Sequence, residues 1–255
     1  MRRNKSHTTL ISAGLAGLLG LSIGGFPMLA VAQKKFTPPK VGLPGRREGG
    51  GTRGGACMTG QKRLTALMPA TNLGLTVSEQ PRLFWYLPEM SAKAAPAVTF
   101  VLMDEKNDEV YNTTFAVTGK PGVVSLGLPQ TATVPPLSVG KRYQWQLALV
   151  CNGETQDYVE GWVQRVQPDN RLTSALQKAT PRDRPAIYAA AGIWQETLST
   201  LAELRRANPR DTRLATDWAD LLKSVKLDKI TREPLVQCCT LTQAKPNNPA
   251  RPNTP

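Results

Sequence analysis

The sequence contains a single histidine, His7, and that residue lies in an N-terminal stretch that we expect to be removed on export. The remaining chain would then have no imidazole. This absence excludes a Ser-His-Asp or Cys-His nucleophile, a histidine general base and any metal site that needs imidazole. The chain also lacks a phosphate-binding loop closed by Gly-Lys-Ser/Thr and a Gly-x-Ser-x-Gly motif. We therefore predict no catalytic residue, no cofactor and no metal site.

The four cysteines include no Cys-x-x-Cys spacing, which argues against a thioredoxin-type motif and a zinc ribbon. An even number of cysteines is typical of disulfides in an oxidising compartment. Four cysteines allow three pairings, among which the sequence does not choose. Our working prediction is one bridge between Cys57 and Cys151. The adjacent Cys238 and Cys239 would either fasten the tail to the body or form a vicinal disulfide.

Long apolar runs are absent after residue 32, so we predict no transmembrane segment once a leader is cleaved. Residues 1–32 have the pattern of a secretory signal peptide. Three basic residues precede an apolar run over 10–23, and Ala-Val-Ala at 30–32 is a cleavage site. An uncleaved membrane anchor is the alternative. We expect export to the periplasm, the extracellular space or the cell surface.

Acidic residues are scarce, and the chain has a formal net charge of +13. Residues 33–255 keep +10 of this, because the leader has three basic residues and no acidic one. The excess lies at the ends, with +5 over 33–56 and +3 over 226–255, whereas residues 57–165 have nine charges of each sign. A nucleic-acid-binding protein concentrates lysine, arginine and aromatic side chains on one folded face. We therefore predict no nucleic-acid partner.

Two segments have little apolar content. Residues 33–56 contain seven glycines and three prolines, and they bury too little surface to offset their ordering entropy. We predict a basic Gly/Pro-rich flexible linker there. The alternative is a basic arm that contacts an acidic wall polymer, an anionic lipid or an acidic partner. Residues 241–255 are rich in proline and asparagine, and we predict a disordered tail.

Between residues 57 and 167, short apolar runs alternate with turn residues, which predicts an antiparallel β-sandwich domain. The candidate strands are 64–68, 82–87, 97–103, 109–117, 122–128, 142–151 and 158–166. Asn-Gly at 152–153 indicates a tight hairpin between the last two. The run 82–87 is aromatic on both faces, so we expect the helical segment to cover its second face.

The run 142–151 places Tyr143 and Trp145 on one face of a strand with a period of two. Leu137, Gly140 and Tyr143 have a spacing that resembles the tyrosine corner of immunoglobulin-like and fibronectin type III sandwiches. We expect Tyr143 and Trp145, together with Trp85 on an earlier strand, to be core residues. The wider aromatic set would form either the core or a sugar-stacking platform: Phe84, Trp85, Tyr86, Tyr111, Tyr143, Trp145 and Trp162.

After Pro168 the apolar spacing changes to three and four residues, which is typical of helices. We predict a helix from Asp183 to about Ala207, another from about Asp211, and a short one over 172–178. These would make a helical segment, residues 168–240, packed on the sandwich as a hairpin. Trp194 and Trp218 would anchor this packing, and a peptide-holding groove is the alternative.

Carboxylate side chains are an alternative source of metal binding or catalysis. The cluster Asp104, Glu105, Asp108 and Glu109 lies in a predicted turn, where it would be solvated or would bind calcium, although the EF-hand pattern is absent. Glu154 and Glu160 could be a glycosidase pair only if the fold brought them together.

Several blocks occur together in this order: RGGAC, LTALMP, PRLFWYLP, VYNTTFAV, PGVVSLGLP, VGKRYQWQLALVC, VEGWVQRV, IYAAAGIWQETLSTLAELR, DWADLL and PLVQCC. This set, from Arg53 to Cys239, resembles an uncharacterised family of secreted cyanobacterial proteins known only as a domain of unknown function. The resemblance implies an exported protein without an assigned activity, cofactor or active site. It supplies no catalytic residue to carry over.

Three hypotheses of function follow. The leading one is an exported, non-catalytic binding or structural module of the periplasm or cell envelope, whose partner is an envelope protein or a glycan. The alternative is a histidine-free hydrolase of wall polysaccharide or peptide, which would need an acidic pair in a concave pocket. The third is an assembly or chaperone partner of exported proteins that uses sheet-edge addition or a helical groove. The sequence defines no oligomeric state.

Overall fold

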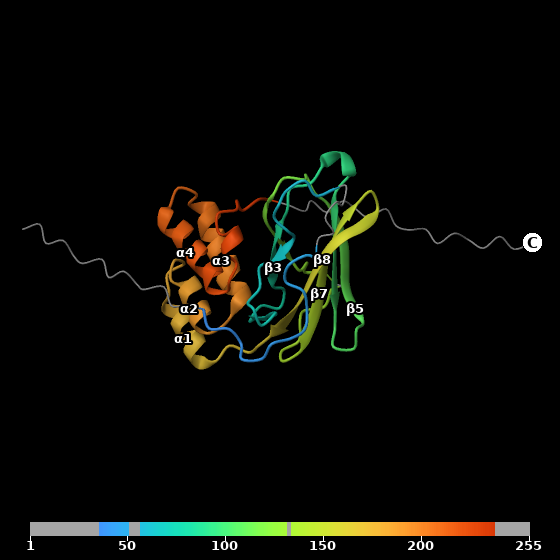
Figure 1. The fold of residues 1–255 in the computed structure, drawn as a ribbon. Coiled ribbons are helices and arrows are strands. Elements are labelled where there is room, and N and C mark those ends of the chain that lie inside the picture. Colours follow the sequence, from blue (N-terminus) through green and yellow to red (C-terminus); the bar gives the residue numbers. More distant parts are fainter. Residues whose placement is uncertain (1–35, 51–56, 132–133, 238–255) are drawn as a thin grey trace, which may run out of the picture. The chain divides into compact units, whose positions relative to one another are not determined.

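The structure, a computed structural model, describes residues 36–50, 57–131 and 134–237, all within one compact unit, Gln33–Pro255. The predicted leader with His7, the predicted tail and the cysteines Cys238 and Cys239 lie outside these residues. The described part combines two β-sheets with four α-helices (Figure 1). None of its helices is long and apolar enough to cross a membrane.

Eight strands form the two sheets, and in each sheet the order along the chain differs from the order in space. They are β1 (Thr65–Ala66), β2 (Leu73–Thr76), β3 (Arg82–Leu87), β4 (Ala97–Met103), β5 (Glu109–Ala116), β6 (Gly122–Gly127), β7 (Arg142–Cys151) and β8 (Glu154–Arg165). One sheet has the order β1-β3-β6 and the other β2-β8-β7-β4-β5. The β7–β8 hairpin turns at Asn152 and Gly153, both with positive φ, as the Asn-Gly pair predicted.

The two sheets pack on each other through aromatic rings. Trp85 of β3 lies 5.6 Å, centroid to centroid, from both Phe100 of β4 and Trp145 of β7. The Tyr143 hydroxyl accepts a hydrogen bond from the Ser138 backbone N–H at 3.0 Å, so it ties β7 to the preceding loop. The alternation in β7 thus places its large side chains between the sheets. The arrangement is sandwich-like.

Strand β2 was not predicted, and it departs from the expected antiparallel pattern. It pairs in parallel with β8, with Leu73 opposite Trp162. The segment is only four residues long and contains Gly74, so it has neither the length nor the alternation that marks a strand. Gly74 lies beneath the helices, since a Cβ there would come 2.4 Å from the Gln195 amide nitrogen. Packing against a helix therefore selects this strand.

The helices are α1 (Asn170–Lys178), α2 (Arg184–Ala190), α3 (Trp194–Ala207) and α4 (Thr212–Ser224). Asp211 caps α4 by accepting hydrogen bonds from the backbone N–H groups of the first turn. Helix α3 packs on β2 and β3, so it covers the second face of β3, as expected (Figure 1). The Trp194 indole N–H donates to the Leu67 carbonyl at 2.7 Å, and Trp218 is fully buried.

The helix predicted from Asp183 to Ala207 is interrupted, because Gly192 lies between α2 and α3 in the left-handed region with φ of 73°. A Cβ at Gly192 would come 2.7 Å from the Thr37 carbonyl oxygen. The Thr37 N–H in turn donates to the Ala189 carbonyl at 3.2 Å. The apolar spacing continued across this point, whereas the break depends on a contact with a segment that is distant in sequence.

That distant segment, residues 36–50, is not the solvated linker that its composition predicted. We call it the strap. Phe36 is 5% exposed, and its ring lies 4.6 Å from Trp194. Further along, Arg46 exchanges two backbone hydrogen bonds with Glu160 of β8, while the Arg47 carbonyl accepts from Ala66 of β1. The strap thus lies between β8 of one sheet and β1 of the other and joins them through backbone hydrogen bonds.

Candidate functional site

The cysteines Cys57 and Cys151 form a disulfide, which confirms the predicted bridge. It joins the segment before β1 to the end of β7, across a sequence separation of 94 residues. A cross-link over so long a loop stabilises a fold chiefly by restricting its unfolded chain. The bridge is buried, with Cys57 1% exposed, so this pair is part of the framework.

The aromatic residues do not form a sugar-stacking platform. Five of the seven candidates are buried: Phe84, Trp85, Tyr86, Tyr143 and Trp145. The other two, Tyr111 and Trp162, are half-buried. Tyr111 lies near Phe100 at 6.1 Å, and the Trp162 indole N–H donates to the Pro44 carbonyl of the strap at 2.8 Å. Both therefore already have partners within the fold.

The candidate carboxylate chemistry is likewise not assembled. Glu154 and Glu160 lie on the same strand, six residues apart, which corresponds to about 20 Å at about 3.3 Å per residue. Glycosidase pairs need about 5–10 Å. In the turn after β4, Asp104 accepts from the Lys106 and Asp108 backbone N–H groups, and Glu105 pairs with Lys141. Among the described residues, no group of three His, Cys, Asp or Glu could hold a metal ion.

A buried carboxylate of β8, Asp157, holds the strap. Asp157 is 4% exposed, and one of its oxygens accepts from the Arg46 guanidinium, the Gly50 N–H and the Tyr158 N–H at 2.9–3.2 Å. The Arg46 guanidinium also lies 4.6 Å from the centre of the Tyr158 ring. The other Asp157 oxygen is buried without a hydrogen-bond partner, and Gly49 packs on it, since a Cβ at Gly49 would lie 1.8 Å away. This cluster clamps the strap to β8.

Glu196, in the first turn of α3, is a second buried carboxyl group. One oxygen accepts from the Thr76 hydroxyl at 2.6 Å and the Ser78 N–H at 3.1 Å, and the other has no partner. Burial raises the pKa of Glu196, and the hydrogen bond from Thr76 opposes this shift. Glu196 does not line the cavity described next. It therefore acts in packing, at the end of β2.

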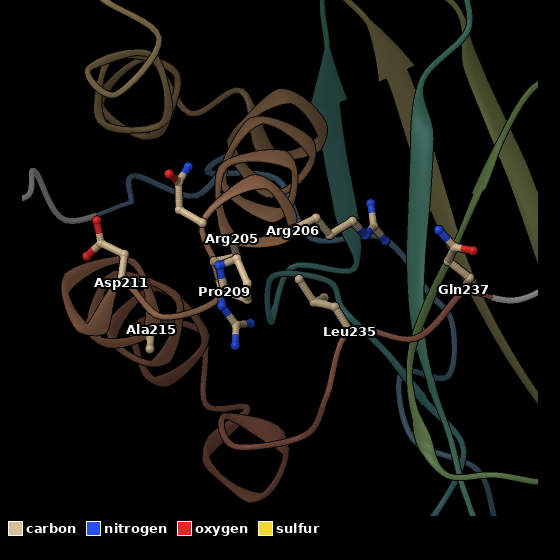
Figure 2. Close-up of a pocket in the computed structure, with 8 residues that line it drawn as sticks. Arg205, Arg206, Pro209, Asp211, Ala215, Leu235 and Gln237 are labelled. Carbon is tan, nitrogen blue, oxygen red and sulfur yellow. The ribbon is translucent and has the colours of Figure 1, made fainter.

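A cavity lies where α3 ends and α4 begins, against the chain segment that follows the helices (Figure 2). Its volume is about 390 Å³, within the range of small-molecule sites. Helix α3 ends before Pro209, which turns the chain into α4. We call this cavity the arginine pocket, and its lining residues are Arg205, Arg206, Asn208, Pro209, Asp211, Ala215, Leu235 and Gln237.

The wall of the pocket that contains Leu235 and Gln237 is held by a backbone bridge to β6. The Val123 N–H of β6 donates to the Pro234 carbonyl at 2.8 Å, and the Val236 N–H donates to the Val123 carbonyl at 2.9 Å. This parallel bridge places Leu235 and Gln237 opposite the end of α3, although they are about thirty residues further along the chain. The pocket therefore exists only in the folded molecule.

The pocket has an excess of positive charge. Among the described residues, neither Arg205 nor Arg206 forms an ion pair with a carboxylate. Burial lowers the pKa of Arg206, the nearby charge of Arg82 lowers it further, and the charge of Glu203 opposes these two effects. Arg206 and Arg82 donate to the same Ser125 hydroxyl, at 3.4 and 3.2 Å.

Arg205 is also incompletely satisfied. Its guanidinium lies 5.1 Å from the centre of the buried Trp218 ring, and one terminal nitrogen is buried without a hydrogen-bond partner. Burial lowers the pKa of Arg205 as well. The carboxylate in the wall, Asp211, is occupied by its ion pair with Arg182 and by its capping of α4. The chemistry that would complete this site is a hydrogen-bond-accepting anion.

Sequence reasoning did not single out this pocket. Two arginines in the last turn of a helix are an ordinary pattern, because cations are stabilised near a helix C-terminus. Their lack of acidic partners becomes visible only once the neighbouring segments are placed. By contrast, the residues expected as helix anchors, Trp194 and Trp218, lie in the core.

Comparison with known proteins gives a family but no activity. A family model described as Domain of Unknown Function (DUF928) matches residues 48–235. No curated protein matches the chain significantly. Among solved structures, the chain is similar to a glycosyl hydrolase family 2 (GH2) member from Bacteroides cellulosilyticus, with 13% identity and a TM-score of 0.24. The likeness covers 65% of this chain and 29% of that one, and it defines neither fold nor function here.

Proposed function

We propose that this chain, which belongs to the DUF928 family of unknown function, is an exported, non-catalytic binding module that takes an anionic ligand in the arginine pocket. The observation that carries the proposal is the pair Arg205 and Arg206, which line a cavity without a carboxylate partner. One terminal nitrogen of Arg205 is buried without a hydrogen-bond partner, which costs free energy unless a ligand satisfies it, whereas Arg206 is exposed to an incoming ligand. The proposal concerns recognition, because the one carboxylate in the pocket wall, Asp211, is engaged by Arg182 and by the first turn of α4.

The cellular setting belongs to the same proposal. A basic, apolar leader ending in Ala-Val-Ala favours export, and the Cys57–Cys151 disulfide is compatible with an oxidising compartment. The resemblance to secreted cyanobacterial proteins favours the periplasm or cell surface of such an organism. The tyrosine-corner contact of Tyr143 supports an immunoglobulin-like origin for the sheets. The hydrolase alternative loses its candidate pair, since Glu154 and Glu160 are about 20 Å apart.

The proposal is tested by affinity electrophoresis of the folded protein through gels containing an acidic or a neutral polysaccharide. We expect polygalacturonate or dextran sulfate to retard the wild-type protein, and neutral dextran to leave its mobility unchanged. The double variant Arg205→Gln/Arg206→Gln should lose this retardation. The matched control is Arg171→Gln/Arg184→Gln, which removes the same charge from exposed helix positions outside the pocket. Equal retardation of both double variants would show that net charge, and not the pocket, binds the polymer.

A further inference from the structure

We infer that the ligand of the arginine pocket is a sugar acid, a hydroxylated ring that bears one carboxylate, of the size of a hexuronate. This inference rests on the proposed function, and it names the ligand class for the same site. It follows from three properties of the pocket wall: the positive charge of its two arginines, the carbon surface that it offers, and the hydrogen-bonding capacity of its amides.

The charge of the pocket suits a carboxylate. Arg205 and Arg206 bring positive charge to the wall and form no ion pair among the described residues, although the charge of Glu203 also acts on Arg206. The Asp211 carboxylate in the same wall is already paired with Arg182. A planar guanidinium also matches a planar carboxylate through two parallel hydrogen bonds.

The size and surface of the pocket require more than an ion. Pro209, Ala215 and Leu235 give it aliphatic walls, and its volume is about 390 Å³. A bare inorganic anion would leave these walls in contact with water. A ligand with a carbon ring would cover them, and this burial adds to the free energy of binding. Figure 2 shows Leu235 facing the α3–α4 connection, with the arginines on the α3 side.

The two amides at the rim distinguish a hydroxylated ligand from an apolar acid. The Asn208 amide nitrogen donates to the Leu204 carbonyl at 3.0 Å, which leaves its side-chain oxygen available as an acceptor. No described residue is hydrogen-bonded to the Gln237 side chain, so its donors and its acceptor are both available. Sugar hydroxyls both donate and accept, and they can therefore satisfy both amides. A fatty acid would leave these amides without partners.

The test is an NMR titration of the full mature chain, 33–255, with sodium glucuronate, glucose, inorganic phosphate and N-acetylalanine as probes. We expect glucuronate to shift the backbone amide signals of residues 205–211 and 235–237 saturably, and glucose to leave them unchanged. Arg206→Gln should weaken glucuronate binding about tenfold, since it removes a charge-assisted hydrogen bond. The control Arg171→Gln should titrate as the wild type does.

The outcomes separate this inference from the proposed function. Phosphate or N-acetylalanine binding to the same signals as tightly as glucuronate would overturn the sugar-acid assignment and leave an anion-binding pocket in place. Shifts by glucuronate that are confined to other residues, or unchanged in Arg206→Gln, would overturn it too. If no anion perturbs the pocket signals and the acidic polysaccharides do not retard the protein, the proposed function itself is wrong.

Discussion

Two Arg-Arg pairs in this molecule have opposite environments, although their local sequences are equally basic. Arg46 and Arg47 of the strap have partners for their guanidinium groups. Arg46 binds Asp157, and Arg47 donates to the Met68 and Val225 carbonyls at 3.2 and 2.8 Å. Arg205 and Arg206 line a cavity and have one hydroxyl and one aromatic ring between them. The first pair fastens the fold, and the second leaves hydrogen-bonding capacity for a ligand.

The difference teaches where stability and binding reside. The strap arginines use their side-chain donors to join β8, the residues that follow β1 and the end of α4, and these bonds hold the sheets and helices together. A satisfied buried donor has nothing left to offer a ligand. In our proposal, the pocket arginines keep this capacity for a ligand. The comparison therefore predicts that variants in the two places differ in what they disturb.

The largest effect is expected at the strap. Asp157→Ala leaves the half-buried Arg46 without its carboxylate and frees the Gly50 N–H. We expect a loss of about 2–3 kcal/mol in the free energy of unfolding, measured by urea denaturation. The control is Glu79→Ala, which breaks the more exposed pair with Arg165 and should cost less than about 1 kcal/mol. Equal losses in the two variants would contradict the strap's role as a clamp.

Glu196 sharpens the comparison. One of its oxygens is buried without a hydrogen-bond partner, as is one nitrogen of Arg205, but Glu196 does not line the arginine pocket. Its folded pKa is raised by burial, so the folded state binds more protons than the unfolded state above pH 4.5. The stability that this adds is complete below pH 4.5 and is lost as pH rises through the raised pKa. Glu196→Gln should remove this dependence and be at least as stable as the wild type at pH 7.

The measurement for Glu196 is the free energy of unfolding from pH 4 to pH 8 in wild type and variant. The control Glu203→Gln alters an exposed carboxylate on the same helix and should keep the wild-type pH profile. A Glu196→Gln profile parallel to that of the wild type would show that this carboxyl titrates alike in the folded and unfolded chains.

The smallest effect on stability is expected in the pocket. Arg206→Gln removes an exposed guanidinium whose only hydrogen-bond partner among the described residues is the Ser125 hydroxyl. The free energy of unfolding should therefore change by less than about 0.5 kcal/mol. Thermal unfolding would check this alongside the binding assays. A loss as large as that of Asp157→Ala would show that Arg206 is structural and that the contrast between the two pairs is false.

Much of the framework could be predicted, because it follows from local pattern. The alternation of β7, the Asn-Gly turn before β8 and the Asp211 cap of α4 are each determined within a few residues. What prediction missed depends on distant neighbours. Strand β2 is selected by packing under α3, and the strap is held by backbone hydrogen bonds to β8 and β1 that its own composition does not predict. Phe36, a lone aromatic in a Gly/Pro-rich stretch, was the one signal that could have indicated docking.

The sequence by itself determined the inventory of side chains and most of the strands and helices, although not β2 or the break at Gly192. Side-chain inventory and apolar period are properties of the chain, and they hold whatever the fold. Only the tertiary structure decided which charges are compensated. Arg46 meets Asp157 across 111 residues, whereas Arg205 and Arg206 line a cavity with Leu235 and Gln237 and form no ion pair among the described residues. Electrostatic pairing acts over a few ångströms in space and not along the chain, so identical dipeptides became a clamp and a candidate binding site.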